Sequence, residues 1–171
     1  MLFQVPLLSL AYAAVAFAAN FIDYDPQPGV QEEFRPFFQA LIDAAENPNV
    51  TTGFTDYFPD DGMQTTLTLH CVGAARIQGC KSFFLSDGRQ LVHFPNTTFV
   101  ASNNATATTY ESHGRIENTY KTQYTILKTI QTEDATPNLS LVPEAQVYWY
   151  HDYFVNPTAV PSDIPCDSLK V

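Results

Sequence analysis

The pattern that most limits the fold of this chain is one amphipathic helix followed by a long run of strands. Between residues 34 and 45 apolar side chains recur three and four positions apart, which is the spacing of one helix face. Pro36 fits the first turn of this helix or bends it, and Asn47-Pro48 ends it. The apolar stripe consists of Phe34, Phe37, Phe38, Leu41, Ile42 and Ala45.

The remaining elements place the chain in the α+β class. Short strands joined by Asn, Gly and Pro turns indicate an antiparallel sheet, and helices that precede a run of strands are typical of α+β folds. We expect helices at residues 51–58 and 74–85, the second with Ile77, Phe83 and Phe84 buried. We expect strands at residues 63–72, 91–94, 97–102, 106–118, 120–131 and 146–155.

The N-terminal residues 1–19 predict a secretory signal peptide. They carry no charge, their apolar stretch from Val5 to Phe17 is short for a bilayer, and Ala16-Phe17-Ala18 has the small-x-small pattern of a cleavage site. A buried apolar helix is the alternative. We expect a secreted protein whose mature chain starts near Ala19 or Asn20. Residues 20–171 then form a single domain with a Pro-rich tail from about residue 156.

The sequons and the cysteines fit a protein that passes through the secretory pathway, where chains are glycosylated and disulfides form. The three cysteines allow one disulfide and leave one thiol free or bonded to another chain. The sequence does not choose the pairing, but a bond from Cys166 to Cys71 or Cys80 would hold the Pro-rich tail, whereas a Cys71–Cys80 bond would gain less. The expected glycosylation sites are Asn49, Asn96, Asn104 and Asn138.

Charge and missing motifs exclude several functions. The net charge of −10 and the lack of any Lys/Arg cluster argue against nucleic acid or an anionic membrane as a partner. The sequence has no phosphate-binding loop, dinucleotide fingerprint, serine-hydrolase elbow or HExxH motif, and no second close Cys/His pair for zinc. Two kinds of function remain after these exclusions. They are chemistry without metal or cofactor, and simple binding of a small hydrophobic molecule.

The order of motifs resembles the NTF2-like (SnoaL-like) superfamily from about Val30 to Val155. The run Tyr57-Phe58-Pro59-Asp60-Asp61-Gly62 is followed by a strand, Gly73, and a helix that ends in Phe83-Phe84. In that superfamily a helical layer leads to F-x-x-D-G, a strand, a glycine, a short helix with an aromatic pair, and long strands. The resemblance implies a cone in which a curved antiparallel sheet wraps N-terminal helices around an apolar pocket.

Within that superfamily, two strands resemble scytalone dehydratase. They are Leu91-Val92-His93-Phe94 and the later Tyr110-Glu111-Ser112-His113-Gly114-Arg115. The resemblance implies a fungal-type member with His93 and His113 as the catalytic pair, although His113 precedes the position of the family's second histidine by several residues.

The histidines and tyrosines of the chain suit proton-transfer chemistry. A dehydratase, isomerase or cyclase needs a base beside a carbonyl and donors that hold the enolate, and histidine can do both. Each histidine could instead be structural. We expect Tyr57, His70, Tyr110 and Tyr148 to contact the substrate.

The aromatic segment from Tyr148 to Phe154 predicts a strand with aromatic side chains on both faces. One face would pack on helices, and the other would face solvent or a second copy in a homodimer through the sheet. Neighbouring strand residues point to opposite faces, so His151 and Asp152 cannot both enter one pocket without a bulge.

The sequence thus predicts a cofactor-independent lyase or isomerase, namely a dehydratase, isomerase or cyclase for a small polyketide- or terpenoid-like molecule. The alternative is a non-catalytic secreted carrier or interaction protein. A carrier would have a pocket lined only by apolar side chains, with all four histidines facing solvent.

Overall fold

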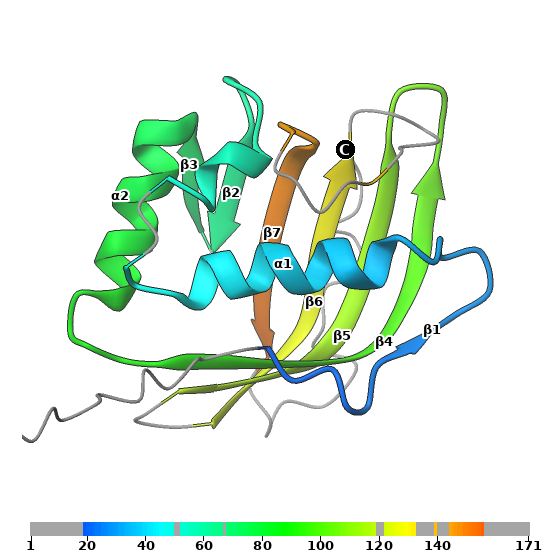
Figure 1. Cartoon of the computed structure of the whole chain (residues 1–171), viewed down its shortest axis with the longest axis horizontal. Coiled ribbons are helices and arrows are strands. Elements are labelled where there is room, and N and C mark those ends of the chain that lie inside the picture. The colour runs from blue at the N-terminus through cyan, green and yellow to red at the C-terminus, as the bar shows by residue number, and fades with distance from the viewer. Residues whose placement is uncertain are drawn as a thin grey trace, which may run out of the picture.

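The computed structural model describes residues 19–49, 52–66, 68–118, 122–132, 139 and 144–155. Over these residues a curved seven-stranded sheet has the order β1-β4-β5-β6-β7-β2-β3. Helix α1 lies across its concave face, and helix α2 lies beside its β2–β3 end (Figure 1). The elements are β1 (Asp25–Pro26), α1 (Phe34–Glu46), η1 (Thr55–Tyr57), β2 (Met63–Thr66), β3 (Leu69–Val72), α2 (Ala74–Leu85), β4 (Leu91–Asn103), β5 (Thr108–Asn118), β6 (Thr122–Thr132) and β7 (Val147–Val155).

The predicted α+β class, with a curved sheet wrapped around a helix, is confirmed. Several predictions fall outside the described residues: the signal peptide, the Asn138 sequon, and the tail with Cys166. No helix of the described residues is long and apolar enough to cross a membrane.

Strand boundaries and directions differ from the prediction in three places. The expected strand 63–72 is instead a hairpin in which Thr66 pairs with Leu69. The Thr-rich alternation of the sequence continues through the turn, so the pattern did not show where one strand ends and the next begins. The expected strands 91–94 and 97–102 form one strand, β4, with an irregularity between Pro95 and Thr98. The sheet is mixed, since β2 pairs with β7 and β1 with β4 in parallel. Of the helix predicted at 51–58, only η1 forms.

Helix α1 forms the core with its predicted face. Its Phe34 ring stacks on Tyr110 at 4.0 Å between centroids, and its Phe37 ring meets Tyr57 edge-on at 5.8 Å. The stripe residues Phe34, Phe37, Phe38, Leu41 and Ile42 are all buried. Burial of each of these large apolar side chains contributes about 1.5–3 kcal/mol to the stability of the fold.

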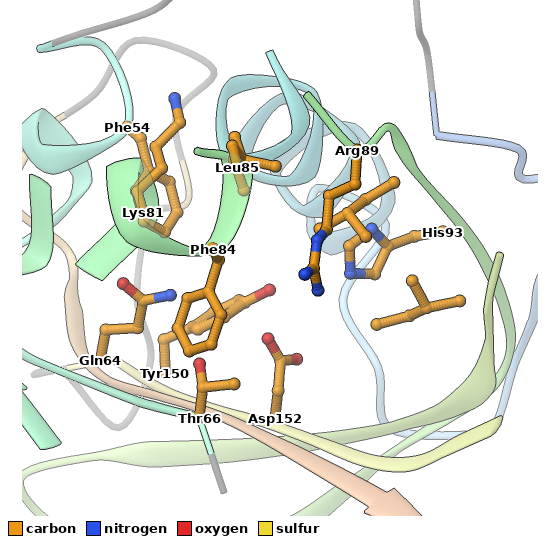
Figure 2. Close-up of a pocket in the computed structure, with 13 residues that line it drawn as sticks. Phe54, Gln64, Thr66, Lys81, Phe84, Leu85, Arg89, His93, Tyr150 and Asp152 are labelled. Atoms are coloured by element: carbon orange, nitrogen blue, oxygen red, sulfur yellow. The ribbon is translucent and has the colours of Figure 1, made fainter. Parts of the chain in front are cut away.

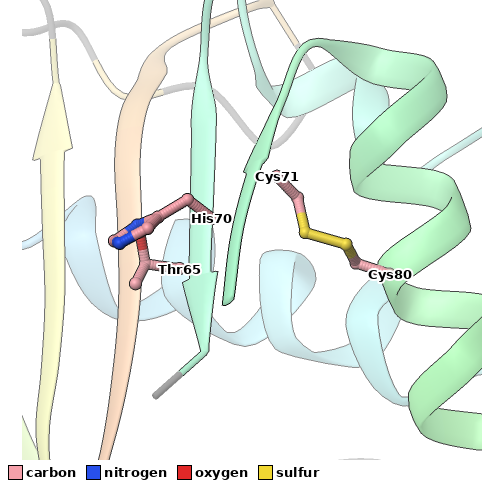
Figure 3. Close-up of a disulfide and its surroundings, with 4 residues drawn as sticks. All are labelled: Thr65, His70, Cys71 and Cys80. Carbon is pink, nitrogen blue, oxygen red and sulfur yellow. A yellow bond between two sulfur atoms is a disulfide. The ribbon is translucent and has the colours of Figure 1, made fainter. Parts of the chain in front are cut away.

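Helix α2 has its predicted bounds but a different buried face. Ile77 and Lys81 are buried, whereas Phe83 is 70% exposed. Two links orient the helix: a disulfide joins Cys80 to Cys71 on β3 (Figure 3), and Lys81 Nζ donates to the Ala44 carbonyl at 2.7 Å. These links turn Phe83 toward solvent.

The Cys71–Cys80 bond makes the preferred pairing with Cys166 wrong. Strand β3 passes into α2 through Gly73, whose φ of +78° is easily adopted only by glycine. This tight connection brings the two α-carbons to 6.6 Å, within the range of a disulfide. Spacing alone did not reveal that a strand and the next helix run side by side.

We predict that Gly114→Ala lowers the free energy of unfolding by about 2–3 kcal/mol. Gly114 lies where β5 passes the irregular part of β4, and a Cβ there would come within 2.4 Å of the Phe94 carbonyl oxygen and 3.0 Å of Pro95 Cα. Both are backbone atoms that cannot rotate away. Urea unfolding measures the loss. The control is Gly79→Ala on α2, where a Cβ meets nothing within 4 Å, and which should stabilise by up to about 1 kcal/mol.

We predict that Cys71→Ala combined with Cys80→Ala costs about 2–3 kcal/mol of stability, since the disulfide closes a loop with a sequence separation of 9. Peptide mapping without reduction should recover a Cys71–Cys80 peptide pair. Recovery of either cysteine linked to Cys166, or an equal stability loss in Cys166→Ala, would contradict this pairing.

Candidate active site

A cavity of about 260 Å³ opens between α2 and the concave face of the sheet. Apolar side chains form much of its wall, and polar side chains converge on it from the strands (Figure 2). Its apolar residues are Ala45, Phe54, Phe84, Leu85, Leu91 and Ile116. Such an enclosed, mostly apolar space with a few polar groups is typical of a small-molecule site.

A buried histidine–carboxylate pair lies at one side of the cavity. Glu46, the last residue of α1, accepts two hydrogen bonds at its Oε1, from the His93 backbone N–H and from His93 Nδ1, both at 2.6 Å. The side chains of His93 and Glu46 are 9% and 0% exposed. When Nδ1 donates to the carboxylate, the neutral form of His93 carries its lone pair on Nε2, which is the form that can act as a base.

Tyr150 and Asp152 face His93 across the cavity (Figure 2). They lie two residues apart on β7 and therefore on the same face. Burial raises the pKa of Tyr150 well above its usual value, and the negative charges of Asp152 and Glu46 add to this effect. Tyr150 is thus a neutral phenol at physiological pH and can donate a hydrogen bond.

Two cationic residues also line the cavity. Burial lowers the pKa of Lys81 to about 8, and its Nζ is held by the Ala44 carbonyl. Arg89 points its guanidinium into the cavity (Figure 2) while its Nε donates to Asp87 at 2.9 Å. These hydrogen bonds from Arg89 lower the pKa of Asp87 to about 2. No group of three or more His, Cys, Asp or Glu among the described residues could hold a metal.

His93 is the one histidine that lines this cavity in the described part of the chain. His113 lies outside it, with Nε2 bonded to Glu111 Oε1 at 2.7 Å and its ring 5.5 Å from Phe99. His70 is exposed, and its Nδ1 lies 3.0 Å from Thr65 Oγ1 (Figure 3). His151 packs against Trp149, so it and Asp152 do face opposite sides, as strand alternation requires.

The three tyrosines expected to contact substrate lie elsewhere. Tyr57 packs in the core against Phe37, and burial followed by the charge of Asp43 raises its pKa. Tyr110 is fully buried, stacks on Phe34 and donates from its hydroxyl to Gln31 Oε1 at 2.6 Å. Burial raises the pKa of Tyr110 to about 12. Tyr148 is 45% exposed. None of them lines the cavity, since Tyr57 and Tyr110 pack against α1 and Tyr148 is exposed.

The main residues that sequence reasoning missed are Glu46, Asp152 and Gln64. Glu46 follows Ile42 by four positions, so it continues the apolar stripe of α1 with a carboxylate, and this was a readable signal. Asp152 shares a strand face with Tyr150. Gln64 reaches the cavity only through the parallel pairing of β2 with β7, in which it lies opposite Tyr150, and no local pattern predicts that pairing.

The sequons at Asn49, Asn96 and Asn104 are exposed. Their side chains are therefore open to a glycosylating enzyme, and their occupancy stays a prediction.

Comparisons with known proteins show the fold. No family model and no curated protein sequence matches the chain. A protein with a cystatin-like fold from Caulobacter vibrioides matches with a TM-score of 0.54 and 17% identity, over 75% of this chain and 94% of that one. A Novosphingobium aromaticivorans protein, whose name proposes an aromatic ring hydroxylase, matches with a TM-score of 0.51 and 14% identity, over 73% and 88%.

The Orange Carotenoid Protein of Anabaena (Nostoc) sp. PCC 7120, which binds canthaxanthin, matches with a TM-score of 0.53 and 11% identity. The match covers 89% of this chain but only 44% of that protein. Identities this low show the fold alone. The predicted cone-shaped α+β fold is confirmed.

The stability contribution of Lys81 should grow with pH. Its pKa is about 8 in the folded state and 10.5 when unperturbed, so between these values the unfolded chain binds more protons than the folded chain. The free energy of unfolding of the wild type should therefore rise relative to that of Lys81→Met from pH 8 to pH 10. Urea unfolding of both proteins at pH 7, 9 and 10 measures the difference. A difference that stays constant or falls would contradict the buried position of the amine.

Proposed function

We propose that the protein binds a small, mainly apolar molecule in this cavity and catalyses proton transfer beside a carbonyl group without a cofactor. This is the chemistry of a dehydratase, isomerase or cyclase. The observation that carries the proposal is the Glu46–His93 pair, a buried and oriented base at the wall of an apolar cavity.

His93 would act as the base. Glu46 fixes the ring through Nδ1 and stabilises the imidazolium that forms when Nε2 takes a proton from the carbon next to the carbonyl. A positioned base of this kind contributes about 10²- to 10⁴-fold in rate. The second hydrogen bond to Glu46, from the His93 backbone, holds the carboxylate and the strand together.

Tyr150 would stabilise the enolate. Its phenol keeps its proton because its pKa is raised, and it faces His93 across the cavity. A neutral donor at this position supports developing negative charge on the substrate oxygen. In the structure the Tyr150 O–H is hydrogen-bonded to Asp152, so to support the enolate it would exchange this acceptor for the substrate oxygen.

The carrier hypothesis is the second candidate, favoured by the shared fold with a protein that binds canthaxanthin. A carrier of apolar molecules needs only apolar walls, whereas His93, Tyr150 and Asp152 all line this cavity. Burying ionisable groups costs stability, so their presence at a cavity points to a role in chemistry or specificity. The polar lining therefore supports the enzyme over the carrier. We also propose that the substrate is polyketide- or terpenoid-like, that the protein passes through the secretory route, and that it forms a homodimer through the sheet.

We predict that the protein accelerates exchange of the α-protons of 2-indanone, a compact apolar ketone, in D₂O. His93→Gln should slow this exchange by about 100-fold or more, because the base is lost. Glu46→Gln should cause a smaller loss, since it removes only the orientation and charge behind the ring. NMR of the ketone measures the rate. Circular dichroism confirms that each variant is folded.

The matched control is His113→Gln, which changes a histidine that is also paired with a glutamate but lies outside the cavity. It should keep the full rate. If 2-indanone binds in the cavity and the wild type does not accelerate exchange, the catalytic proposal fails and the carrier is favoured. Equal rates in the wild type and His93→Gln would exclude His93 as the base.

A further inference from the structure

The first described residues are fixed by contacts that bear on how the chain is processed. The Ala19 backbone nitrogen lies 2.8 Å from Asp43 Oδ1 on α1, and the Asn20 backbone N–H donates to the His93 carbonyl oxygen at 2.8 Å. Ala19 is 5% exposed and belongs to the apolar core cluster. The segment next to the predicted cleavage site is therefore part of the folded domain.

The contact at Ala19 could also hold an ammonium group. The separation of 2.8 Å suits a hydrogen bond to the carboxylate from an amide and from an ammonium alike. In the uncleaved chain this nitrogen is a neutral amide. Hydrolysis of the Ala18–Ala19 bond would make it an α-ammonium, and its hydrogen bond to Asp43 would become charge-assisted, which is roughly twice as strong as a neutral one.

The contacts also distinguish the two expected start positions. Cleavage after Ala18 keeps the buried Ala19 methyl group and supplies a positive charge to Asp43. Cleavage after Ala19 removes both, and it places the new ammonium at Asn20, next to the His93 carbonyl oxygen. The Ala16-Phe17-Ala18 sequence has small residues at the positions that a signal peptidase reads for the first of these cuts.

We propose that the chain is cut between Ala18 and Ala19 and that the new α-ammonium of Ala19 forms an ion pair with Asp43. The ion pair connects the new N-terminus to α1 three residues before Glu46, the partner of His93. The new N-terminus would therefore lie next to the two residues of the candidate base, since Asp43 is three residues before Glu46 and Asn20 is hydrogen-bonded to the His93 backbone. This inference does not depend on the proposed catalysis.

The test has two parts. The full chain is expressed in a secreting eukaryotic host, and the N-terminal residue of the secreted protein is determined by Edman degradation and intact mass. Ala19 is expected. A secreted chain that begins at any other residue, or that retains residues 1–18, would overturn the cleavage site.

The ion pair is tested with chains made to start at Ala19, or at one added serine before Ala19, each with Asp43 or with Asp43→Asn. The added residue returns the Ala19 nitrogen to an amide and moves the charge away. With Asp43 present, the chain that starts at Ala19 should have an unfolding constant about three- to tenfold smaller than the extended chain. In the Asp43→Asn chains this advantage should disappear. An equal advantage in the Asp43→Asn chains, or none with Asp43 present, would overturn the ion pair.

Discussion

The packing of α1 against the concave face of the sheet determines where everything else in this protein lies. The aromatic residues in the first turns of the helix, Phe34 and Phe37, fill the concavity against Tyr110 and Tyr57. The helix ends at Glu46, and there the concavity is no longer filled. The cavity is therefore the part of the cone that α1 does not reach. His93, which is hydrogen-bonded to the carboxylate with which the helix ends, is one of the polar residues that line this cavity.

The two links of α2 complete that cavity. The disulfide to β3 and the Lys81 hydrogen bond to the end of α1 hold the helix on the β2–β3 side, so Phe84 and Leu85 form part of the wall. Without these links a 12-residue helix with one fully buried apolar residue would have little to hold it against the sheet. The exposure of Phe83 follows from this orientation.

Sequence patterns predicted what depends on local periodicity. The stripe of α1 and the α+β order were readable because α1 repeats its pattern over three turns and the strands repeat theirs along their length. The bounds of α2 were also predicted, but its buried face was not, since its apolar residues do not form one stripe. His93 was found through the family resemblance and does line the cavity. The three tyrosines expected to contact substrate do not line it, because the sequence does not show that Tyr57 and Tyr110 pack against α1. The parallel pairing of β2 and β7, which brings Gln64 opposite Tyr150, joins residues far apart in the chain and has no local signal.

Glu46 contributes both to the fold and to the candidate site. At the end of the stripe an apolar residue would extend the core, yet this chain has a fully buried carboxylate whose desolvation costs several kcal/mol before compensation. Its two hydrogen bonds come from a single residue, His93, one from the backbone and one from the ring. The backbone bond alone would satisfy a structural role in joining α1 to β4. The ring bond in addition fixes the imidazole at the wall of the cavity, and the proposed proton transfer requires a base held in this way.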